Sequence, residues 1–455
     1  MLFSLLLACT STEKKDSGIL IQDQAPIDWM RGSPPLTETD TSIRAIVHLH
    51  SHHSHDACDG NPQPDGIPDE DCLADLRSAL CEVRIDAAFL SDHPEHSMEA
   101  ESFEELFLMR EGDQPIYEDG VLIANQMTCE SGHQVLIFPG IESSAMMPLA
   151  LTQHVDGSYD GSESTREQVR EQGAIFWIAH TEQRDVEELL SQELDGLEIY
   201  QLHANLDPSI RSEYLGLDSF SYLEEVQPFF FPTAEEVNPP HPDLSVLGFL
   251  LPNEPSLSKM EQVGMVQPIG VSGGTDAHQN VFSNEASDGE RIDSYRRMMR
   301  WFNTKIEIKQ GSSAQEIREA LRSRRSWVNF EVLGTPAGFK AVVANGDTEL
   351  PMGSEFTMRN GQELQITLPT LSSSSPQDPY VAPMIEGRIF HFDGQNREQV
   401  HTWTSGTAVL PISDAGVYRV EIWIQPLHLK PYLGDRPEYA ENWMPWIYSG
   451  GFFAR

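Results

Sequence analysis

The feature that most constrains the fold of this chain is a series of short apolar runs separated by helical patterns. The runs are Ile43–His50, Ala87–His93, Val135–Ser143, Leu149–His154, Ala174–His180, Gly196–Leu202 and Pro268–Asp276. Several are almost continuously apolar, as is typical of parallel strands buried on both faces. Between them lie helical patterns with apolar residues three or four positions apart, for example Leu73, Leu76, Leu80 and Val83. This alternation predicts an α/β fold with a parallel sheet, and about seven strands favour a closed barrel over an open sheet.

Most of these runs end on a histidine or a carboxylate. The candidate ligands at or just after the run ends are His48, His50, His93, Glu142, His154, His180, Asp276 and His278. In His48-Leu49-His50 the two imidazoles point to the same side, because strand side chains alternate with a period of two. Active sites of α/β barrels lie at the carboxyl edge of the strands. Six runs that agree at this edge predict a metal site.

The order of the motifs resembles that of the PHP (polymerase and histidinol phosphatase) superfamily over residues 43–330. The motifs are His-x-His, an Asp-His pair after an apolar strand, Pro-Gly-x-Glu, a strand-terminal His and a final Asp-x-His. The resemblance implies a distorted seven-stranded (β/α) barrel and a metal-dependent hydrolase. It favours a phosphoesterase, in which divalent metal ions activate a bound water and stabilise charge on the attacking and leaving oxygens.

The resemblance also implies how the ligands are shared among two or three metal ions. The groups are His48, His50, Glu142 and Asp276 for the first ion, Glu142, His180 and His154 for the second, and Asp56, His93 and His278 for the third. His55 competes with Asp56 for the third group. The residues expected to act in catalysis are Glu142, Asp276 and His180. Mixed imidazole and carboxylate ligands suit Zn, Mn or Fe more than Mg or Ca.

Few basic residues lie near the motifs, which leaves the hydrolysed bond open. Arg184 is the nearest candidate for holding a phosphate, and a surface arginine is its other interpretation. The first alternative is therefore a carboxyl ester or carbamate hydrolase on the same metals, again with a small-molecule ester as substrate. A non-catalytic surface lipoprotein that binds a glycan or a protein is an alternative of another class. Two nearby residues match no ligand position: His203, which follows a run, and Asp92, which either orients His93 or ends its strand.

The N-terminal nine residues, MLFSLLLAC, resemble the signal and lipobox of bacterial lipoproteins. This resemblance implies a signal peptide over residues 1–8, a lipidated Cys9 and a polar tether over 9–42. The chain is then expected at the bacterial cell envelope, anchored to a membrane and facing the periplasm or the exterior. A chance apolar N-terminus is the alternative interpretation.

The net charge of -41 comes from 71 acidic and 30 basic residues. A polyanion would be repelled, so nucleic acid is excluded as a partner. Four cysteines follow Cys9, an even number that is compatible with disulfides in an oxidising compartment. A bond between Cys58 and Cys72 would close an acidic loop and leave Cys81 to pair with Cys129, but the spacing does not fix this connectivity.

The loop between Cys58 and Cys72 resembles calcium loops of the Asp/Asn-x-Asp/Asn-x-Asp-Gly kind. The candidate ligand positions are Asn61, Gln63, Asp65, Gly66 and Asp69. Cys72 occupies the final acidic position, so an ordinary acidic turn is the alternative to a calcium site.

Two further segments differ in texture from the alternating pattern. Residues 206–265 are rich in proline and aromatic residues, which predicts an insertion that either covers the site or decorates the surface. Residues 331–455 contain short alternating runs between turn residues, which predicts a β-sandwich domain. The predicted barrel therefore spans 43–330, with the β-sandwich after it.

Overall fold

The computed structural model describes residues 30–37, 40–97, 102–155, 159–232, 237–309, 311–372 and 381–455. The predicted signal peptide, Cys9 and the tether up to residue 29 lie outside these ranges. The residues that follow, also predicted as tether, pack against the fold: Met30 is buried, and Arg31 forms ion pairs with Glu82 and Glu290 at 2.7 and 2.9 Å. No helix within the described ranges is long and apolar enough to cross a membrane.

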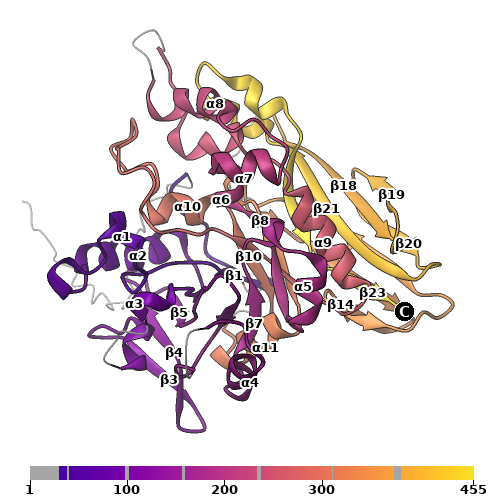
Figure 1. Cartoon of the computed structure of the whole chain (residues 1–455). Coiled ribbons are helices and arrows are strands. Elements are labelled where there is room, and N and C mark those ends of the chain that lie inside the picture. Colours follow the sequence, from indigo (N-terminus) through magenta and orange to yellow (C-terminus); the bar gives the residue numbers. More distant parts are fainter. Residues whose placement is uncertain are drawn as a thin grey trace, which may run out of the picture.

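Two sheets carry the parallel strands of the first part of the chain (Figure 1). The strands of these sheets that correspond to the predicted apolar runs are β1 (Ser42–Ile46), β2 (Ala87–Phe89), β5 (Gln134–Phe138), β6 (Met147–Leu149), β7 (Ile175–Ile178), β8 (Gly196–Gln201) and β9 (Gly270–Gly274). Strands β1, β2 and β5 pair in parallel, as do β7, β8 and β9. Isolated bridges at Gly140–Leu149 and Leu49–Ala277 link the two sheets. The mixed α/β class predicted from the sequence is confirmed.

Strand β6 departs from the predicted pattern. The sequence predicts a parallel strand over Leu149–His154, whereas the strand occupies Met147–Leu149 and pairs antiparallel with β7. Leu149 lies opposite Ile175, the first residue of β7, so the carboxyl end of β6 lies at the amino end of its neighbour. Antiparallel strands also widen the first sheet: β3 (Gln114–Glu118) and β4 (Val121–Thr128) beyond β5, and β10 (Asn303–Glu307) and β11 (Ser326–Asn329) beyond β1.

Helices connect most of these strands. They are α1 (Ala57–Gly60), α2 (Glu70–Val83), α3 (Pro94–Ser97), α4 (Glu163–Glu171), α5 (Val186–Ser191), α6 (Leu202–Leu206), α7 (Pro208–Glu213), α8 (Ser221–Phe230), α9 (Glu254–Gly264), α10 (Tyr295–Trp301) and α11 (Ala314–Arg322). Helix α2 shows why the sequence forms them: its predicted apolar face is buried, and the Asp69 carboxylate accepts a hydrogen bond from the Cys72 N–H at its first turn.

The segment 206–265 is largely helical and contains α7, α8, α9 and the 3-10 helix η4 (Pro242–Gly248). Helix α8 buries Tyr222, Val226 and Phe230, which are spaced four apart on one face. Asp243 of η4 is fully buried and accepts hydrogen bonds from the guanidinium groups of Arg296 and Arg297 in α10. These contacts tie the segment to the helix that leads back into the sheet.

The C-terminal part is built from strands, as expected. They are β12 (Pro336–Ala337), β13 (Lys340–Asn345), β14 (Thr348–Pro351), β15 (Glu355–Phe356), β16 (Glu363–Thr367), β17 (Thr370–Leu371), β18 (Met384–Phe392), β19 (Arg397–Trp403), β20 (Thr407–Pro411), β21 (Gly416–Gln425), β22 (Met444–Ser449) and β23 (Phe452–Ala454). Strand β22 pairs antiparallel with β11, so the sheet of the first part continues into the second. The buried ion pair of Arg44 with Glu331, at 2.9 Å, also crosses the predicted boundary.

Candidate metal centre

Four buried side chains converge just beyond the carboxyl ends of the parallel strands. They are His48 and His50 after β1, Glu142 after β5 and Asp276 after β9. The Nε2 atom of His48 lies 3.0 Å from His50 Nε2, 3.0 Å from Glu142 Oε2 and 3.2 Å from Asp276 Oδ1. Ligand atoms around a tetrahedral metal with bonds of about 2.0–2.1 Å are separated by about 3.3–3.4 Å. Four electron-pair donors at nearly this spacing fit a metal ion between them.

The loops that carry these ligands are held together by backbone hydrogen bonds. The N–H of Asp276 donates to the His48 carbonyl at 3.2 Å, and the N–H of His50 donates to the Ala277 carbonyl at 3.1 Å. Asp276 adopts φ 51°, and His180 adopts φ 53°. Left-handed backbone at residues other than glycine costs free energy and is common at functional sites.

Glu198 on β8 orients His48, and the sequence alone did not single it out. Its fully buried carboxylate accepts a hydrogen bond from His48 Nδ1 at 2.7 Å and another from the His180 N–H at 3.0 Å. With the Nδ1 proton held there, the Nε2 lone pair of His48 faces the other ligands. Gly274 makes room for this contact, because a Cβ atom at that position would lie 2.3 Å from Glu198 Oε1.

A second group shares both carboxylates of the first. Glu142 places Oε2 beside His48 and His50 and Oε1 at 3.1 Å from His180 Nε2. Asp276 places Oδ1 beside the same two imidazoles and Oδ2 at 3.4 Å from His203 Nδ1. Each carboxylate therefore faces two ligand groups, as carboxylates that bridge two metal ions do. His203 takes the place that the sequence gave to His154; its position just after β8 was the signal that could have identified it.

The third group gathers the remaining predicted ligands around Asp56. Its Oδ2 atom lies 3.3 Å from His278 Nε2 and 3.6 Å from His93 Nε2. The ring of His50 stacks on that of His278 with centroids 3.8 Å apart, so this group is contiguous with the first. His55, the competitor of Asp56, instead pairs with Glu95 at 3.6 Å on the surface.

The electrostatics of the metal-free site are those of an anionic cluster. Burial raises the pKa of Glu142 and of Asp276, but the positive charge of His48, together with the hydrogen bonds and charges of the other imidazoles, holds both pKa values well below their usual range. Burial lowers the pKa of His48, but the charges of Glu142, Asp276 and Glu198 together raise it by more, so that it lies well above its usual value. Burial lowers the pKa of His50 to about 4, whereas the raised pKa values of His48, His93 and His180 keep protons on these three rings in the absence of metal. A divalent cation would replace those protons.

His154 is the predicted ligand that the structure does not bring to the cluster. Its ring packs edge-on against Phe103, with centroids 4.9 Å apart, and none of the three ligand groups in the described residues includes it. The cause is the antiparallel direction of β6, which carries the residues that follow it away from the carboxyl ends of β5 and β7.

The described contacts bear on four further interpretations of the sequence. Asp92 does not orient His93, because its two oxygens accept from the N–H and hydroxyl of Ser51 at 2.6 and 2.8 Å. Arg184 donates to the Ser144 carbonyl at 2.6 Å and to Glu188. Asp65 and Asp69 of the predicted calcium loop belong to none of the groups of histidine, cysteine and carboxylate side chains among the described residues, and the calcium site stays a prediction. Both cysteine pairs form disulfides, Cys58–Cys72 and Cys81–Cys129.

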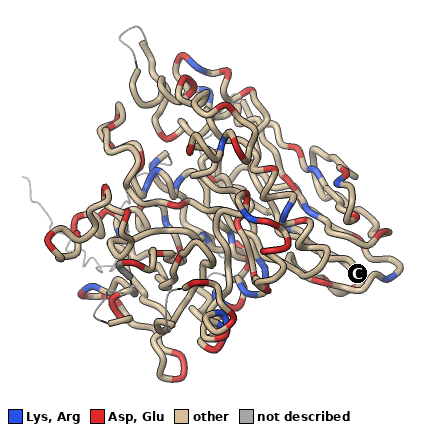
Figure 2. The backbone as a smooth tube through the Cα atoms, in the orientation of Figure 1, with Lys and Arg blue, Asp and Glu red and all other residues tan. Residues whose placement is uncertain are grey.

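A cavity of about 470 Å³ opens over the second and third groups. Asp56, Glu142 and Asp276 line its polar side. Its other side is apolar and comes from α6, α8, α10 and the segment after β9. None of the described residues that line it is lysine or arginine. Acidic residues are spread along both parts of the chain (Figure 2).

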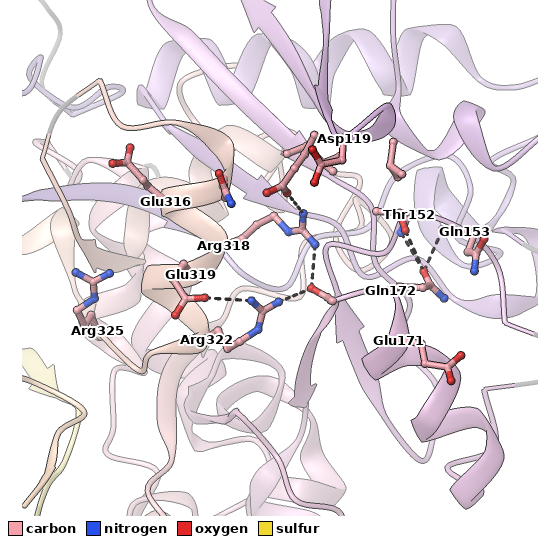
Figure 3. A pocket seen from close by; sticks show the side chains of 15 residues that line it. Asp119, Thr152, Gln153, Glu171, Gln172, Glu316, Arg318, Glu319, Arg322 and Arg325 are labelled. Carbon is pink, nitrogen blue, oxygen red and sulfur yellow. Dashed lines mark hydrogen bonds and ion pairs between the residues drawn. The ribbon is translucent and has the colours of Figure 1, made fainter.

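A second pocket, of about 680 Å³, gathers the arginines that the metal cavity lacks (Figure 3). We call it the arginine pocket; Arg318, Arg322 and Arg325 line it together with acidic residues. Arg318 and Arg322 both donate to the carbonyl of Gly173, which precedes β7. Arg318 also pairs with Glu118 at 3.5 Å. Arg318 and Arg322 therefore bind the protein itself.

Comparisons with known proteins give one structural likeness. No protein-family model matches the chain, and no curated protein matches it. The chain is similar to a solved structure from Bacteroides vulgatus, described as a two-domain protein containing a predicted PHP-like metal-dependent phosphoesterase. The two are 15% identical with a TM-score of 0.38, and the match covers 92% of this chain and 98% of that one.

Proposed function

We propose that this chain is a metal-dependent hydrolase, and that it cleaves phosphoesters at a site for two or three divalent transition metal ions on a PHP-like barrel. The proposal rests on how Glu142 and Asp276 place their two carboxylate oxygens. One oxygen of each lies beside the imidazoles of the first group, and the other lies beside His180 for Glu142 and beside His203 for Asp276. An ion pair that serves only stability does not need two carboxylates that each face two groups of imidazoles. The resemblance of the strand-end motifs to the PHP superfamily supports the same reading.

The ligand types fit Zn, Mn or Fe. When bound, such ions supply a water of lowered pKa and positive charge for the attacking and leaving oxygens of the ester. The chain's own residues prepare this chemistry: Glu198 fixes the proton of His48 on Nδ1, and Gln201 donates to Asp276 Oδ2 at 3.1 Å. These contacts hold the ligand atoms in place before substrate binds, which avoids reorganisation during the reaction.

One observation favours a second candidate, a carboxyl ester or carbamate hydrolase on the same metals. The cavity contributes no lysine or arginine from its described lining, so a phosphate would rely on the metal ions alone for positive charge. A carboxyl ester carries no charge that needs such a partner.

The decisive experiment combines elemental analysis of the purified protein with hydrolysis of p-nitrophenyl phosphate, bis-p-nitrophenyl phosphate and p-nitrophenyl acetate. We expect bound transition metal and turnover of a phosphoester that is lost on chelation and restored by metal. Turnover of the acetate alone would favour the second candidate. Metal without turnover of any of the three would contradict both.

We also propose, on the N-terminal motif alone, that Cys9 is lipidated and anchors the chain at the bacterial cell envelope. Metabolic labelling with a radioactive fatty acid should mark the expressed protein. The label should disappear in Cys9→Ser, and unchanged labelling would contradict the proposal.

A further inference from the structure

Another pocket, which is almost purely apolar, lies next to the apolar side of the metal cavity. This apolar pocket has a volume of about 210 Å³ and is lined by residues of α8 and α10, among others. Five side chains line both spaces, so the two pockets adjoin: Leu206, Tyr222, Val281, Phe282 and Met298. Phe230 and Trp301 line only the apolar pocket. The apolar pocket is therefore the space next to the metal cavity on its apolar side.

The surface of the apolar pocket is almost entirely apolar, and the polar groups of Asp293 and Trp301 are engaged by the protein. Of its lining residues, Asp293 directs one oxygen to the N–H groups of Val281 and Phe282, at 2.8 and 2.9 Å, and the other to Arg291 at 2.7 Å. The indole N–H of Trp301 donates to the Asp243 carbonyl at 2.9 Å. What remains facing the pocket is carbon, so it recognises a group without hydrogen-bonding atoms.

The size of the apolar pocket matches a small ring or a short chain. An engineered apolar cavity of about 150 Å³ stays dry and binds benzene. At about 210 Å³ the pocket has room for an aryl ring or a short alkyl group. It also leaves apolar surface open to water, since the side chains of Leu223 and Val281 are 43% and 59% exposed. Covering this surface is favourable.

We infer that the substrate is an ester with an apolar, aryl-sized substituent, which fills the apolar pocket while the ester group lies at the metal ligands. The inference rests on the proposed function for the identity of the reacting group. The apolar pocket, however, selects its occupant by shape and lack of polarity, whichever ester is cleaved. Selectivity for the substituent would then come from α6, α8 and α10, outside the ligand groups.

Binding of paired, non-hydrolysable ligands to the metal-loaded protein tests the inference. The pairs are phenylphosphonate against methylphosphonate and phenylacetate against acetate, with each dissociation constant measured by calorimetry. Each buried methylene contributes about fourfold in affinity, so the phenyl member of at least one pair should bind at least about tenfold more tightly. Equal affinities within both pairs, or no binding by any of the four, would overturn the inference.

Two variants locate the preference. Val226→Phe fills the apolar pocket from α8 without touching the metal cavity, and should reduce the phenyl preference to near unity. Leu223→Glu places a charge at the exposed mouth and should weaken the preference even if the first variant folds poorly. The matched controls are Val409→Phe and Val409→Glu on exposed β20, which should leave it unchanged. A preference that survives both pocket variants would overturn the inference.

The binding assay also separates this inference from the proposed function. The protein could prefer the phenyl ligand, lose this preference in Val226→Phe, and yet hydrolyse no ester. This result would support the apolar pocket as a binding site and contradict the proposed hydrolase activity. Ester hydrolysis together with equal affinities for the phenyl and methyl ligands would support the hydrolase activity and contradict the role of the apolar pocket.

Discussion

The metal cavity and the arginine pocket lie at opposite ends of the strand β7. Gly173, just before β7, contributes to the arginine pocket, and His180, just after it, contributes to the metal cavity. The arginine pocket is the larger, at about 680 Å³ against about 470 Å³. Arg318 and Arg322 pair with Glu118, Glu319 and the Gly173 carbonyl, whereas the metal cavity brings imidazoles and carboxylates together with no lysine or arginine among its described lining. The convergence of imidazoles and carboxylates with shifted pKa values, and not volume, distinguishes the functional candidate.

The largest effect is expected from Asp276→Asn, which removes the carboxylate shared by two ligand groups. Metal ions contribute several kcal/mol to such reactions, so kcat/KM for the best phosphoester should fall by about three orders of magnitude. The matched control is Asp119→Asn in the arginine pocket, which should leave kcat/KM unchanged. Equal activity of the two variants would remove the distinction between the pockets.

A smaller effect is expected from Glu198→Gln, because Glu198 orients a ligand and does not itself touch the metal. Loss of such a partner weakens metal affinity by about 10- to 100-fold. Titration with a metal buffer should show this loss, while Glu118→Gln in the arginine pocket should bind metal as the native chain does. Native affinity in Glu198→Gln would show that the contact with His48 is incidental.

Metal affinity should also depend on pH. Burial lowers the pKa of His180 and His93, but their carboxylate partners raise it more, to about 9 in each case. Neutral imidazole is the metal ligand, so binding must displace these protons. Affinity should therefore rise about tenfold per pH unit for each displaced proton between pH 7 and 9. Calorimetry in buffers of different ionisation enthalpy measures the proton release, and none at pH 7 would contradict the assignment.

The same shifts predict how the metal-free protein responds to pH. A pKa that is raised in the folded state stabilises the fold below the ordinary histidine value of about 6.5, and this contribution is lost as the pH rises through about 9. The Tm of the metal-free protein should therefore decrease over this range, and added metal should reverse the decrease.

The smallest effect is expected from the arginine pocket. Arg322→Ala removes a donor to the Gly173 carbonyl, and should cost about 1 kcal/mol of unfolding free energy without changing kcat/KM. Arg322→Lys retains a donor and should recover part of the stability. Chemical denaturation measures both variants, and a fall in kcat/KM would show that the two pockets are coupled.

The sequence predicted which candidate ligands lie together in most cases, because the carboxyl ends of parallel strands meet at one edge. His48, Glu142, His180 and Asp276 follow this rule and converge. The rule failed for His154, since an antiparallel strand carries its end to the opposite edge, and strand direction is not encoded in a short apolar run. Glu198 was missed because a carboxylate inside a buried strand has no local signal; its partner lies 150 residues away in sequence.

The C-terminal strands show the same limit at larger scale. Their alternating runs predicted strands at about the right places, and β13, β16, β18 and β21 occupy them. The pairing of Trp327 in β11 with Ser449 in β22 was not predictable, because backbone hydrogen bonds between distant segments leave no trace in local periodicity. The sandwich arrangement stays a prediction.

This pairing has a consequence for biosynthesis. From β1 the sheet continues through β10 to β11. The next strand beside β11 is β22, which is made only when residues 444–449 leave the ribosome. Until then β11 presents an unpaired edge, which invites pairing with other nascent chains. The ligand-bearing half is therefore expected to need protection by a chaperone during translation until the last strands are released.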